Sequence, residues 1–118
     1  MYEWRRDEIV GNERVYVGHF DAAGDETVRH SHDREHRTGV EHKGSVYVEM
    51  WDQRDKTVRL EAKIHANGFV TVPAKWEHKL TALESDTYVY CAFQRFDAQG
   101  NEYPDPREST QCYAEGLT

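Results

Sequence analysis

The histidines of this chain are spaced in a way that suits metal coordination. His30, His32, His36 and His42 lie within thirteen residues, and His78 follows a short apolar segment that ends in proline. In an extended chain, residues two apart point to the same face, so His30 and His32 would project side by side from one strand. Neutral imidazole is the commonest side-chain ligand for zinc, iron, copper and nickel. The sequence therefore predicts a metal centre built on β-strands.

A plainer interpretation exists for each histidine. His30 and His32 would also suit an exposed strand face with no ligand. His42 lies near a turn and is expected to be solvated. His19 and His65 share no spacing with the others, so we expect them to be ordinary residues.

The segments that must position these histidines have the pattern of short β-strands. Apolar and polar residues alternate with period two, and no helical stripe develops. The expected strands are residues 14–20, 26–32, 36–41, 45–51, 57–65, 69–72, 77–83 and 87–96. On the strand 57–65, one face is expected to carry Val58, Leu60, Ala62 and Ile64. Such spacing, with turn residues between the strands, predicts an all-β sandwich or barrel.

Length and composition set the outer limits. We expect one domain over residues 1–118, with a core at about 13–96 and an irregular C-terminal tail at 103–118. Residues 1–10 are expected to form an edge strand, or an arm that lies on a partner subunit. Cys91 lies in an alternating apolar run and is expected to be a small buried residue, with the reduced state favoured over a disulfide to Cys112.

Charge and hydropathy exclude some partners. The 15 basic and 22 acidic residues give a net charge of −7, and no basic stripe is present, so nucleic-acid binding is not expected. No apolar run approaches the length of a membrane span. Charged residues occupy the N-terminus where a signal peptide would be apolar, so we expect a cytoplasmic protein with no membrane partner.

With these residues in view, the chain resembles the cupins, small β-barrels of the double-stranded β-helix type that carry two separated metal motifs. The usual first motif is a glycine, five residues, H-x-H, three or four residues, a glutamate, six residues and a glycine. Here Gly24 precedes His30 and His32 at that spacing, and His36 stands where glutamate is usual. The closing glycine matches Gly44, one residue late.

The second cupin motif is a glycine, five residues, proline, one residue, glycine, two residues, histidine, three residues and an asparagine. Asn67 holds the first glycine position, and asparagine is the next best residue for a left-handed turn. Pro73 and His78 keep the usual spacing, with Lys75 where glycine is usual and Ala82 where asparagine is usual. The resemblance covers roughly residues 13–96.

The resemblance implies a divalent transition metal (Fe, Mn, Ni or Zn) held by His30, His32, His36 and His78. With His36 in place of glutamate the shell has no carboxylate, which favours anionic or bidentate oxygen ligands and lowers the pKa of bound water. A shift of register would instead bring in Glu35. Neighbouring residues on a strand face opposite ways, so only one of the two enters the barrel, and the motif count favours His36.

Three kinds of function follow from this resemblance. The first is a metal-dependent enzyme acting on a small molecule, with a dioxygenase favoured by analogy with three-histidine iron cupins, then an isomerase or lyase. The second is a cupin module that binds or senses a small molecule without turning it over. The third is a structural barrel that holds no metal. By the same analogy we expect a homodimer.

No catalytic side chain is assigned by the sequence. Candidates for an aromatic lining of the barrel are Tyr47, Trp51, Trp76, Tyr90 and Phe93, for each of which plain core packing is the simpler interpretation. In the last strand Gln94 and Arg95 have opposite orientations, so one of them is expected to point inward. An inward arginine would be a carboxylate anchor, although arginines more often lie at the surface.

Overall fold

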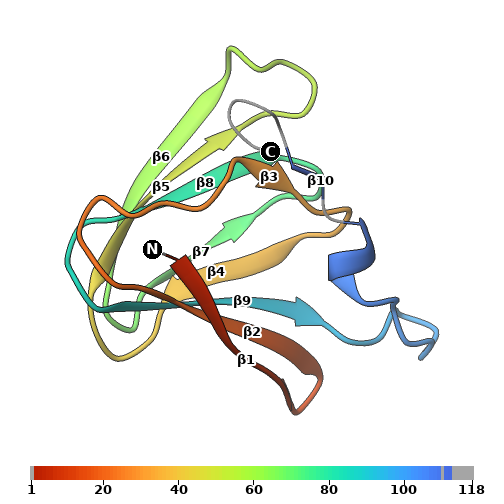
Figure 1. Cartoon of the computed structure of the whole chain (residues 1–118). Coiled ribbons are helices and arrows are strands. Elements are labelled where there is room, and N and C mark those ends of the chain that lie inside the picture. The colour runs from red at the N-terminus through yellow and green to blue at the C-terminus, as the bar shows by residue number, and fades with distance from the viewer. Residues whose placement is uncertain (1, 110, 113–118) are drawn as a thin grey trace.

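The chain folds into two five-stranded sheets that face each other (Figure 1). The structure is a computed structural model that describes residues 2–109 and 111–112, apart from the side chains of 4, 108, 109, 111 and 112. The first sheet has the order β1 (Tyr2–Val10), β2 (Glu13–Phe20), β9 (Thr87–Gln94), β4 (His36–Val40), β7 (Phe69–Val72). The second has the order β10 (Gln111–Cys112), β3 (His30–Ser31), β8 (Glu77–Ala82), β5 (Ser45–Trp51), β6 (Arg59–His65). The predicted all-β class is confirmed.

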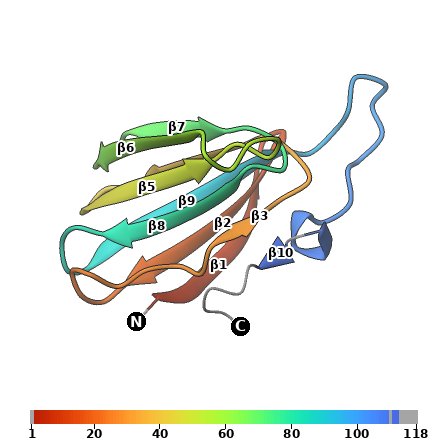
Figure 2. The same cartoon turned by 90° about the horizontal axis from the view of Figure 1, so that it is seen from above.

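Successive strands alternate between the two sheets, which gives the winding of a double-stranded β-helix. After the β1–β2 hairpin, the chain passes from β2 in the first sheet to β3 in the second, then to β4, then to β5, and from there to β10 the β5–β6 hairpin alone interrupts the alternation. The paired strands of both sheets are antiparallel throughout the described part of the chain. Figure 2 shows the strands lying side by side in the barrel, seen from above.

The core lies between the sheets and follows from the period-2 pattern of the strands. In β5, Val46, Val48 and Met50 are buried, while the residues between Val46 and Met50 face outward. They pack with inward residues of the other strands, among them Phe20, Val40, Val72, Leu80 and Val89.

The strand β6 departs from the expected pattern. Of the four residues expected on one face, Ile64 is buried, but Leu60 is 50% exposed and Val58 is 44% exposed. The facing strand β7 is only four residues long, so the far half of the β5–β6 hairpin has no opposite sheet to bury it (Figure 1).

The segment before the H-x-H pair is extended but forms little ladder. A strand was expected over 26–32, whereas β3 covers only His30–Ser31. Upstream of it, the Thr27 amide donates to the Leu80 carbonyl (2.9 Å), and the Leu80 amide donates to the Thr27 hydroxyl (3.0 Å). The Thr27 side chain thus replaces a backbone acceptor. Arg29 then pairs with the buried carboxylate of Glu77 (2.6 Å), which anchors the segment beside β8.

The two turns named by the second motif adopt the backbone that the motif requires. Asn67 has φ of 70° and Lys75 has φ of 67°, both in the left-handed region. Lys75 therefore holds a conformation that glycine adopts without strain. Its amide donates to the His32 carbonyl (2.8 Å), so this turn is tied directly to the H-x-H segment.

The N-terminus forms an edge strand. β1 pairs with β2, and the Tyr2 ring packs on Phe20 with 4.8 Å between centroids. A Cβ at Gly18 would collide with that ring, so glycine is required there. In the described part of the chain no helix is long and apolar enough to cross a membrane.

The C-terminal tail is irregular, as expected, but it folds back onto the barrel. A short 3₁₀ helix, η1 (Pro106–Ser109), leads to β10, which pairs with β3. The rest of the tail, at residues 110 and 113–118, lies outside the described residues, as does the side chain of Cys112.

Candidate metal centre

The β3–β8 ladder joins the two motifs. His30 in β3 lies directly opposite His78 in β8, and His78 lies opposite Met50 on its other side. His32 follows β3, and His36 is the first residue of β4 in the facing sheet. The predicted residues therefore come together from three segments. We call His30, His32, His36 and His78 the histidine cluster.

The rings of the histidine cluster are mutual neighbours. Centroid distances are 4.2 Å for His30–His78, 5.0 Å for His30–His32, 4.8 Å for His32–His36 and 5.0 Å for His36–His78. Ring nitrogens of His30, His32 and His78 lie within 4.8 Å of one another. Two bonds of about 2.1 Å to one ion place donor atoms roughly 3–4 Å apart. The three nitrogens are thus near the spacing of a shared cation, and His36 lies beside this trio.

Backbone carbonyls fix the ring orientation of two cluster members. The Nδ1 atom of His30 lies 2.8 Å from the Val28 carbonyl, and that of His78 lies 3.1 Å from the Trp76 carbonyl. A carbonyl only accepts, so in each ring Nδ1–H is the donor and Nε2 carries the free lone pair. This is the arrangement in which a second hydrogen bond orients a metal-binding imidazole.

Buried nitrogens without hydrogen bonds mark the site. His78 is fully buried and its Nε2 has no partner, and His36 is 3% exposed with neither ring nitrogen in a hydrogen bond of good geometry, although the Arg34 carbonyl lies near. Buried polar atoms are rarely left unpaired, because losing water without a replacement is costly. A cation bonded to these nitrogens would supply the missing partner, so the residues fit a metal.

Burial keeps the cluster neutral. Burial, followed by repulsion that a charge on His32 would meet from the neighbouring His36, His30 and Arg34 side chains, lowers the pKa of His32 to about 2. Burial and the neighbouring His30 likewise lower the pKa of His36 to about 3. For His78 the pKa is lowered well below its usual value by burial and by the other three rings. Neutral imidazole is the form that binds metal, so the site is ready at neutral pH.

Glu35 and His36 differ in orientation, as neighbouring residues of an extended chain do. Glu35 is exposed, whereas His36 is buried and its ring stacks on Phe93 at 4.7 Å and 17°. The inward residue is therefore the histidine. The cluster contains four imidazoles and no carboxylate.

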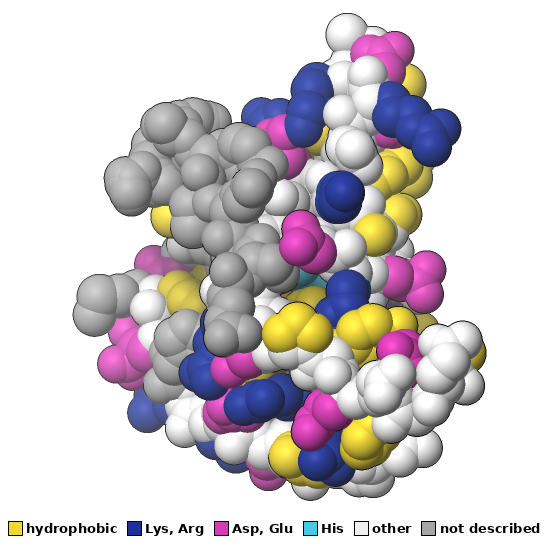
Figure 3. Space-filling view, turned by 90° about the vertical axis from the view of Figure 1, so that its right-hand side faces the viewer, with side chains coloured by type: hydrophobic (Ala, Val, Ile, Leu, Met, Phe, Trp, Pro, Cys, Tyr) yellow, Lys and Arg dark blue, Asp and Glu magenta, His cyan; other side chains and the backbone are white. Residues whose placement is uncertain are grey.

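A cavity of 680 Å³ adjoins the cluster. Its lining includes His30 and His32, but neither His36 nor His78, so the cluster faces the cavity through the H-x-H pair. The other described lining residues are mostly apolar or aromatic: Tyr2, Tyr16, Thr27, Val28, Leu80, Val89, Cys91 and Phe93, with Asp25, Glu26, Pro106 and Arg107 completing the lining. Figure 3 shows a small patch of histidine surface near the middle of the face viewed there. The volume suits a small organic molecule.

One of the five aromatic residues predicted as lining candidates is among the described lining residues of the cavity. Phe93 lines the cavity, while Tyr47 contacts Glu61 and Arg59 on the outer side of its sheet. Trp51 lies under the Arg29 guanidinium at 3.7 Å. The remaining two candidates do not reach the cavity: Trp76 packs against the core, and the Tyr90 hydroxyl lies over Gly39.

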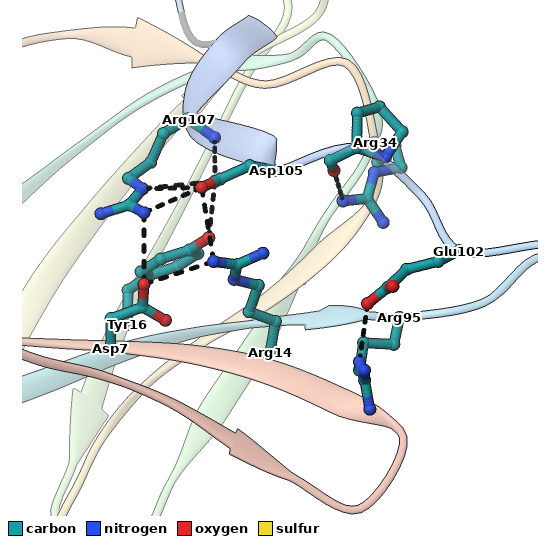
Figure 4. Close-up of polar contacts among 9 residues, drawn as sticks. Asp7, Arg14, Tyr16, Arg34, Arg95, Glu102, Asp105 and Arg107 are labelled. Carbon is teal, nitrogen blue, oxygen red and sulfur yellow. Dashed lines mark hydrogen bonds and ion pairs between the residues drawn. The ribbon is translucent and has the colours of Figure 1, made fainter.

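Neither Gln94 nor Arg95 points inward, which corrects the prediction that one of them would. The Gln94 side chain is exposed, and the Arg95 Nε donates to Glu102 at 2.9 Å (Figure 4). The strand β9 ends at Gln94, so the alternation that implied an inward residue no longer applies at Arg95. Cys91 is a free thiol that lines the cavity, and burial raises its pKa to about 11.

The sequence did not indicate the residues that close the cavity end of the barrel. Asp105 accepts hydrogen bonds from the Tyr16 hydroxyl (2.7 Å) and from the Arg107 guanidinium (2.8 Å) (Figure 4). Asp7 of β1 also pairs with Arg107 at 3.2 Å. We call Asp7, Tyr16, Asp105 and Arg107 the tail clasp. It depends on how the tail folds back, for which no local sequence signal exists.

His19 is buried, and its hydrogen bonds indicate a structural role instead of metal binding. Arg5, which only donates, lies 3.2 Å from Nδ1, and Nε2 lies 2.6 Å from an oxygen of Asp86. Nδ1 is therefore the acceptor and Nε2–H donates to the carboxylate. Although Glu3 and Asp21 lie close enough to form a second group of ligating types, both nitrogens of His19 are occupied. As expected, His42 is exposed, and it stacks on Tyr88.

No protein-family model and no curated protein matches this chain by sequence. Solved structures do match. They include Peruvianin-I, a cysteine peptidase from Thevetia peruviana latex (TM-score 0.67, 10% identity, 86% of this chain and 56% of that chain). Oxalate oxidase in complex with the substrate analogue glycolate also matches (TM-score 0.61, 19% identity, 70% and 42%), as does oxalate decarboxylase from Bacillus subtilis (TM-score 0.65, 18% identity, 86% and 24%).

These likenesses concern the fold, and both oxalate enzymes are cupin-fold proteins. The chain has the cupin fold, a double-stranded β-helix barrel, with a histidine cluster that could hold a metal at one end. The expected fold is confirmed. The chain spans 56% of Peruvianin-I and less than half of each oxalate enzyme, so it is similar to one part of each.

Proposed function

We propose that this protein is a metal-dependent enzyme acting on a small molecule. His30, His32 and His78 would hold a divalent Fe, Mn, Ni or Zn ion, with His36 as the fourth ligand. The observation that carries the proposal is a buried group of neutral imidazoles with unpaired nitrogens, placed next to a cavity of 680 Å³. Dioxygenase chemistry is favoured, followed by isomerase or lyase chemistry.

The residues of the chain have separate roles in this proposal. His30 and His78 are held by backbone carbonyls, and each would present Nε2 to the ion. His30 and His32 border the cavity, so an incoming molecule meets the cluster there. A redox metal would supply a place for substrate and dioxygen to react, and a redox-inactive one would polarise a carbonyl or activate water.

The absence of a carboxylate in the cluster affects which molecules bind. Four neutral ligands leave the charge of a dication uncompensated, which favours an anionic or bidentate oxygen ligand. Oxalate oxidase, with the same fold, was solved with glycolate, a molecule that carries two such oxygens. Glycolate is therefore a reasonable first compound for this chain.

The second candidate is a cupin module that binds a small molecule without turning it over. One observation favours it: the hydroxyl of Tyr16 and the thiol of Cys91 in the described lining are poorly suited to proton transfer, which leaves Asp25 and Glu26 for that role. The Tyr16 hydroxyl is engaged by Asp105, and the raised pKa of Cys91 keeps its thiol protonated at neutral pH. Oxygen uptake or product formation by iron-loaded protein would establish the enzyme, and reversible ligand binding without turnover would establish the binding module.

Metal analysis of purified protein tests the shared basis of both candidates. Wild-type protein should carry about one divalent ion per chain, and His78→Ala should lose it because a fully buried ligand is removed. The control is His42→Ala, which changes an exposed histidine outside the cluster and should retain the ion. Equal metal content in all three proteins would exclude His78 from the site and leave the proposal without support.

A further inference from the structure

The cavity beside the histidine cluster is larger than a two- or three-carbon acid needs. A molecule of six or seven heavy atoms occupies on the order of 100–150 Å³, whereas the cavity measures 680 Å³. The apolar walls come from Val28, Leu80, Val89 and Phe93. Such walls stabilise a ligand by removing apolar surface from water.

Both arginines at and near the cavity already have partners, although only Arg107 is paired with carboxylates. Arg107 is the arginine of the described lining, and it pairs with Asp105 at 2.8 Å and Asp7 at 3.2 Å. Arg34, near the cluster, donates to the carbonyls of Gln94 (2.7 Å) and Pro104 (3.1 Å).

The other charged residues of the lining are acidic. Glu26 pairs with the nearby Lys79 ammonium at 3.1 Å, and Asp25 accepts a hydrogen bond from the Ala22 amide at 3.1 Å. A carboxylate that is not on the metal would therefore find apolar walls and no unpaired cation among the described lining residues, which is unfavourable.

The groups available to bind a polar part of a ligand are thus concentrated at the histidine-cluster end of the cavity. The Tyr16 hydroxyl donates to Asp105, and the Cys91 thiol is a weak donor in contact with Thr38 at 3.5 Å. A ligand consequently finds its strong polar interaction at the histidine cluster and apolar contact elsewhere.

From this arrangement we propose that the ligand has two adjacent oxygens that chelate the metal, an apolar body of ring size or larger, and at most one negative charge. Small dicarboxylates bind weakly. The inference rests on the proposed metal function for the oxygen pair, but the apolar body is recognised by the protein alone.

Three chelators bound to zinc-loaded protein test the class: tropolone, 4-isopropyltropolone and malonate. Zinc is redox-inactive, so equilibrium binding is read from the tropolone absorbance and, for malonate, from competition. The isopropyl group should tighten binding about tenfold by adding buried apolar surface. Malonate should bind at least tenfold more weakly than tropolone. Malonate binding equal to tropolone, or no gain from the isopropyl group, would overturn the proposal.

A cavity variant with a matched control locates the binding. Val28→Arg introduces a cation into the lining and should reverse the preference, weakening 4-isopropyltropolone and strengthening malonate. Val58→Arg is the control, because Val58 has nearly the same exposure (44% against 43% for Val28) but lies outside the cavity. Equal ligand preference in the two variants would place binding elsewhere.

A metal-free arm separates the two proposals. The fluorescence of 2-naphthol, which has an apolar body and no chelating pair, should change on binding to metal-free protein, and Val28→Arg should abolish the change. If zinc fails to bind but 2-naphthol does, the metal function is wrong and the apolar cavity stands. If zinc binds but 2-naphthol and the tropolones do not, the ligand class is wrong.

Discussion

His36 distinguishes this cluster from the usual cupin pattern, and we expect two roles for it, as a packing residue and as a metal ligand. Its ring stacks on Phe93 and also lies 4.8 Å from the His32 ring. A ligand and a packing residue respond differently to substitution. Substitution of His36 by leucine and by glutamate separates the two roles.

We expect His36→Leu to lower zinc affinity at least tenfold while largely retaining stability, because leucine preserves the packing on Phe93. His36→Glu restores the usual carboxylate. It should destabilise the metal-free protein, since an unpaired buried carboxylate is costly, and show the larger increase in melting temperature on adding zinc. Thermal unfolding with and without zinc measures both effects. Unchanged zinc affinity in His36→Leu would leave His36 with packing alone.

Lys75 stands at a turn position where the cupin motif has glycine, and its backbone conformation explains that preference. The motif places glycine there, and φ of 67° explains the preference physically. A residue with a Cβ in this region lowers the free energy of unfolding by about 1–2 kcal/mol relative to glycine. The larger conformational entropy that glycine loses on folding offsets part of this difference.

Lys75→Gly should therefore raise the free energy of unfolding by up to about 1 kcal/mol. Lys75→Ala keeps the strained Cβ and serves as the matched control, with no gain expected. Urea unfolding at neutral pH compares the three proteins. A gain in the alanine variant equal to that in the glycine variant would point to the lysine side chain instead of the backbone.

At the scale of elements, the segment that leads to His30 depends on a buried ion pair. Its ladder is short, so Arg29 and the buried Glu77 hold it against β8. Lys56 also pairs with Glu77. His78 is the next residue after Glu77, so the same contact supports both the β3 and the β8 side of the histidine cluster.

Arg29→Met should lower the free energy of unfolding by about 3 kcal/mol, since it leaves a buried carboxylate with one cation fewer. It should also weaken zinc binding, because His30 loses its support. Arg54→Met, at an exposed loop position, is the control. Adding Glu77→Gln to Arg29→Met should recover part of the stability. No recovery would show that the charge of Glu77 is not the cause.

The tail clasp is the second element-scale device. Asp105 has its pKa lowered, first by the Arg107 guanidinium and also by the Tyr16 hydroxyl. Asp105→Asn should loosen the segment around η1 without unfolding the barrel. Hydrogen exchange at the Arg107 amide, which donates to Asp105 (2.9 Å), should become about fivefold faster or more. Unchanged exchange would show that other contacts hold the tail.

Local patterns predicted the strands well and their neighbours less well. The alternation in 45–51 and 87–96 correctly predicted β5 and β9, because burial of one face produces a period-two pattern within each strand. The exposure of Leu60 depends on the length of a strand in the other sheet, and the tail clasp joins residues 7, 16, 105 and 107. Such contacts between distant residues have no periodic signature. The histidine cluster was predictable because two spaced motifs describe it.

At the scale of the whole molecule, the neutral cluster couples stability to pH. Burial lowers the pKa of His30, His32, His36 and His78 in the folded protein. Unfolded histidine titrates near pH 6.5. Below that pH the unfolded chain binds protons that the folded, metal-free protein does not, so acid favours unfolding.

The free energy of unfolding of metal-free protein should be level above about pH 7 and fall below about pH 6.5 by up to about 1.4 kcal/mol per pH unit for each cluster histidine. Urea unfolding at pH 7.5, 6 and 5 measures the slope. His36→Leu should reduce it by one histidine's share, while His42→Ala should leave it unchanged. A flat profile would mean that the cluster takes up protons when folded.

Assembly stays a prediction. We expect a homodimer, with the N-terminal edge strand β1 as the arm, and Ile9 and Val10 are exposed on it at 52% and 55%. Analytical ultracentrifugation of the wild type and of Ile9→Lys checks this. The variant should shift toward monomer, because a charge on an edge strand opposes pairing. A monomeric wild type would contradict the predicted homodimer.

The two carbonyls that orient His30 and His78 belong to the main chain at positions 28 and 76. Replacing either side chain leaves its carbonyl in place. Val28 nevertheless reaches the cavity, so one residue orients His30 with its carbonyl and lines the cavity with its side chain. A side-chain substitution at this position would change which molecules fit the cavity while leaving the carbonyl that orients His30 in place, which makes it a natural starting point for engineering new selectivity.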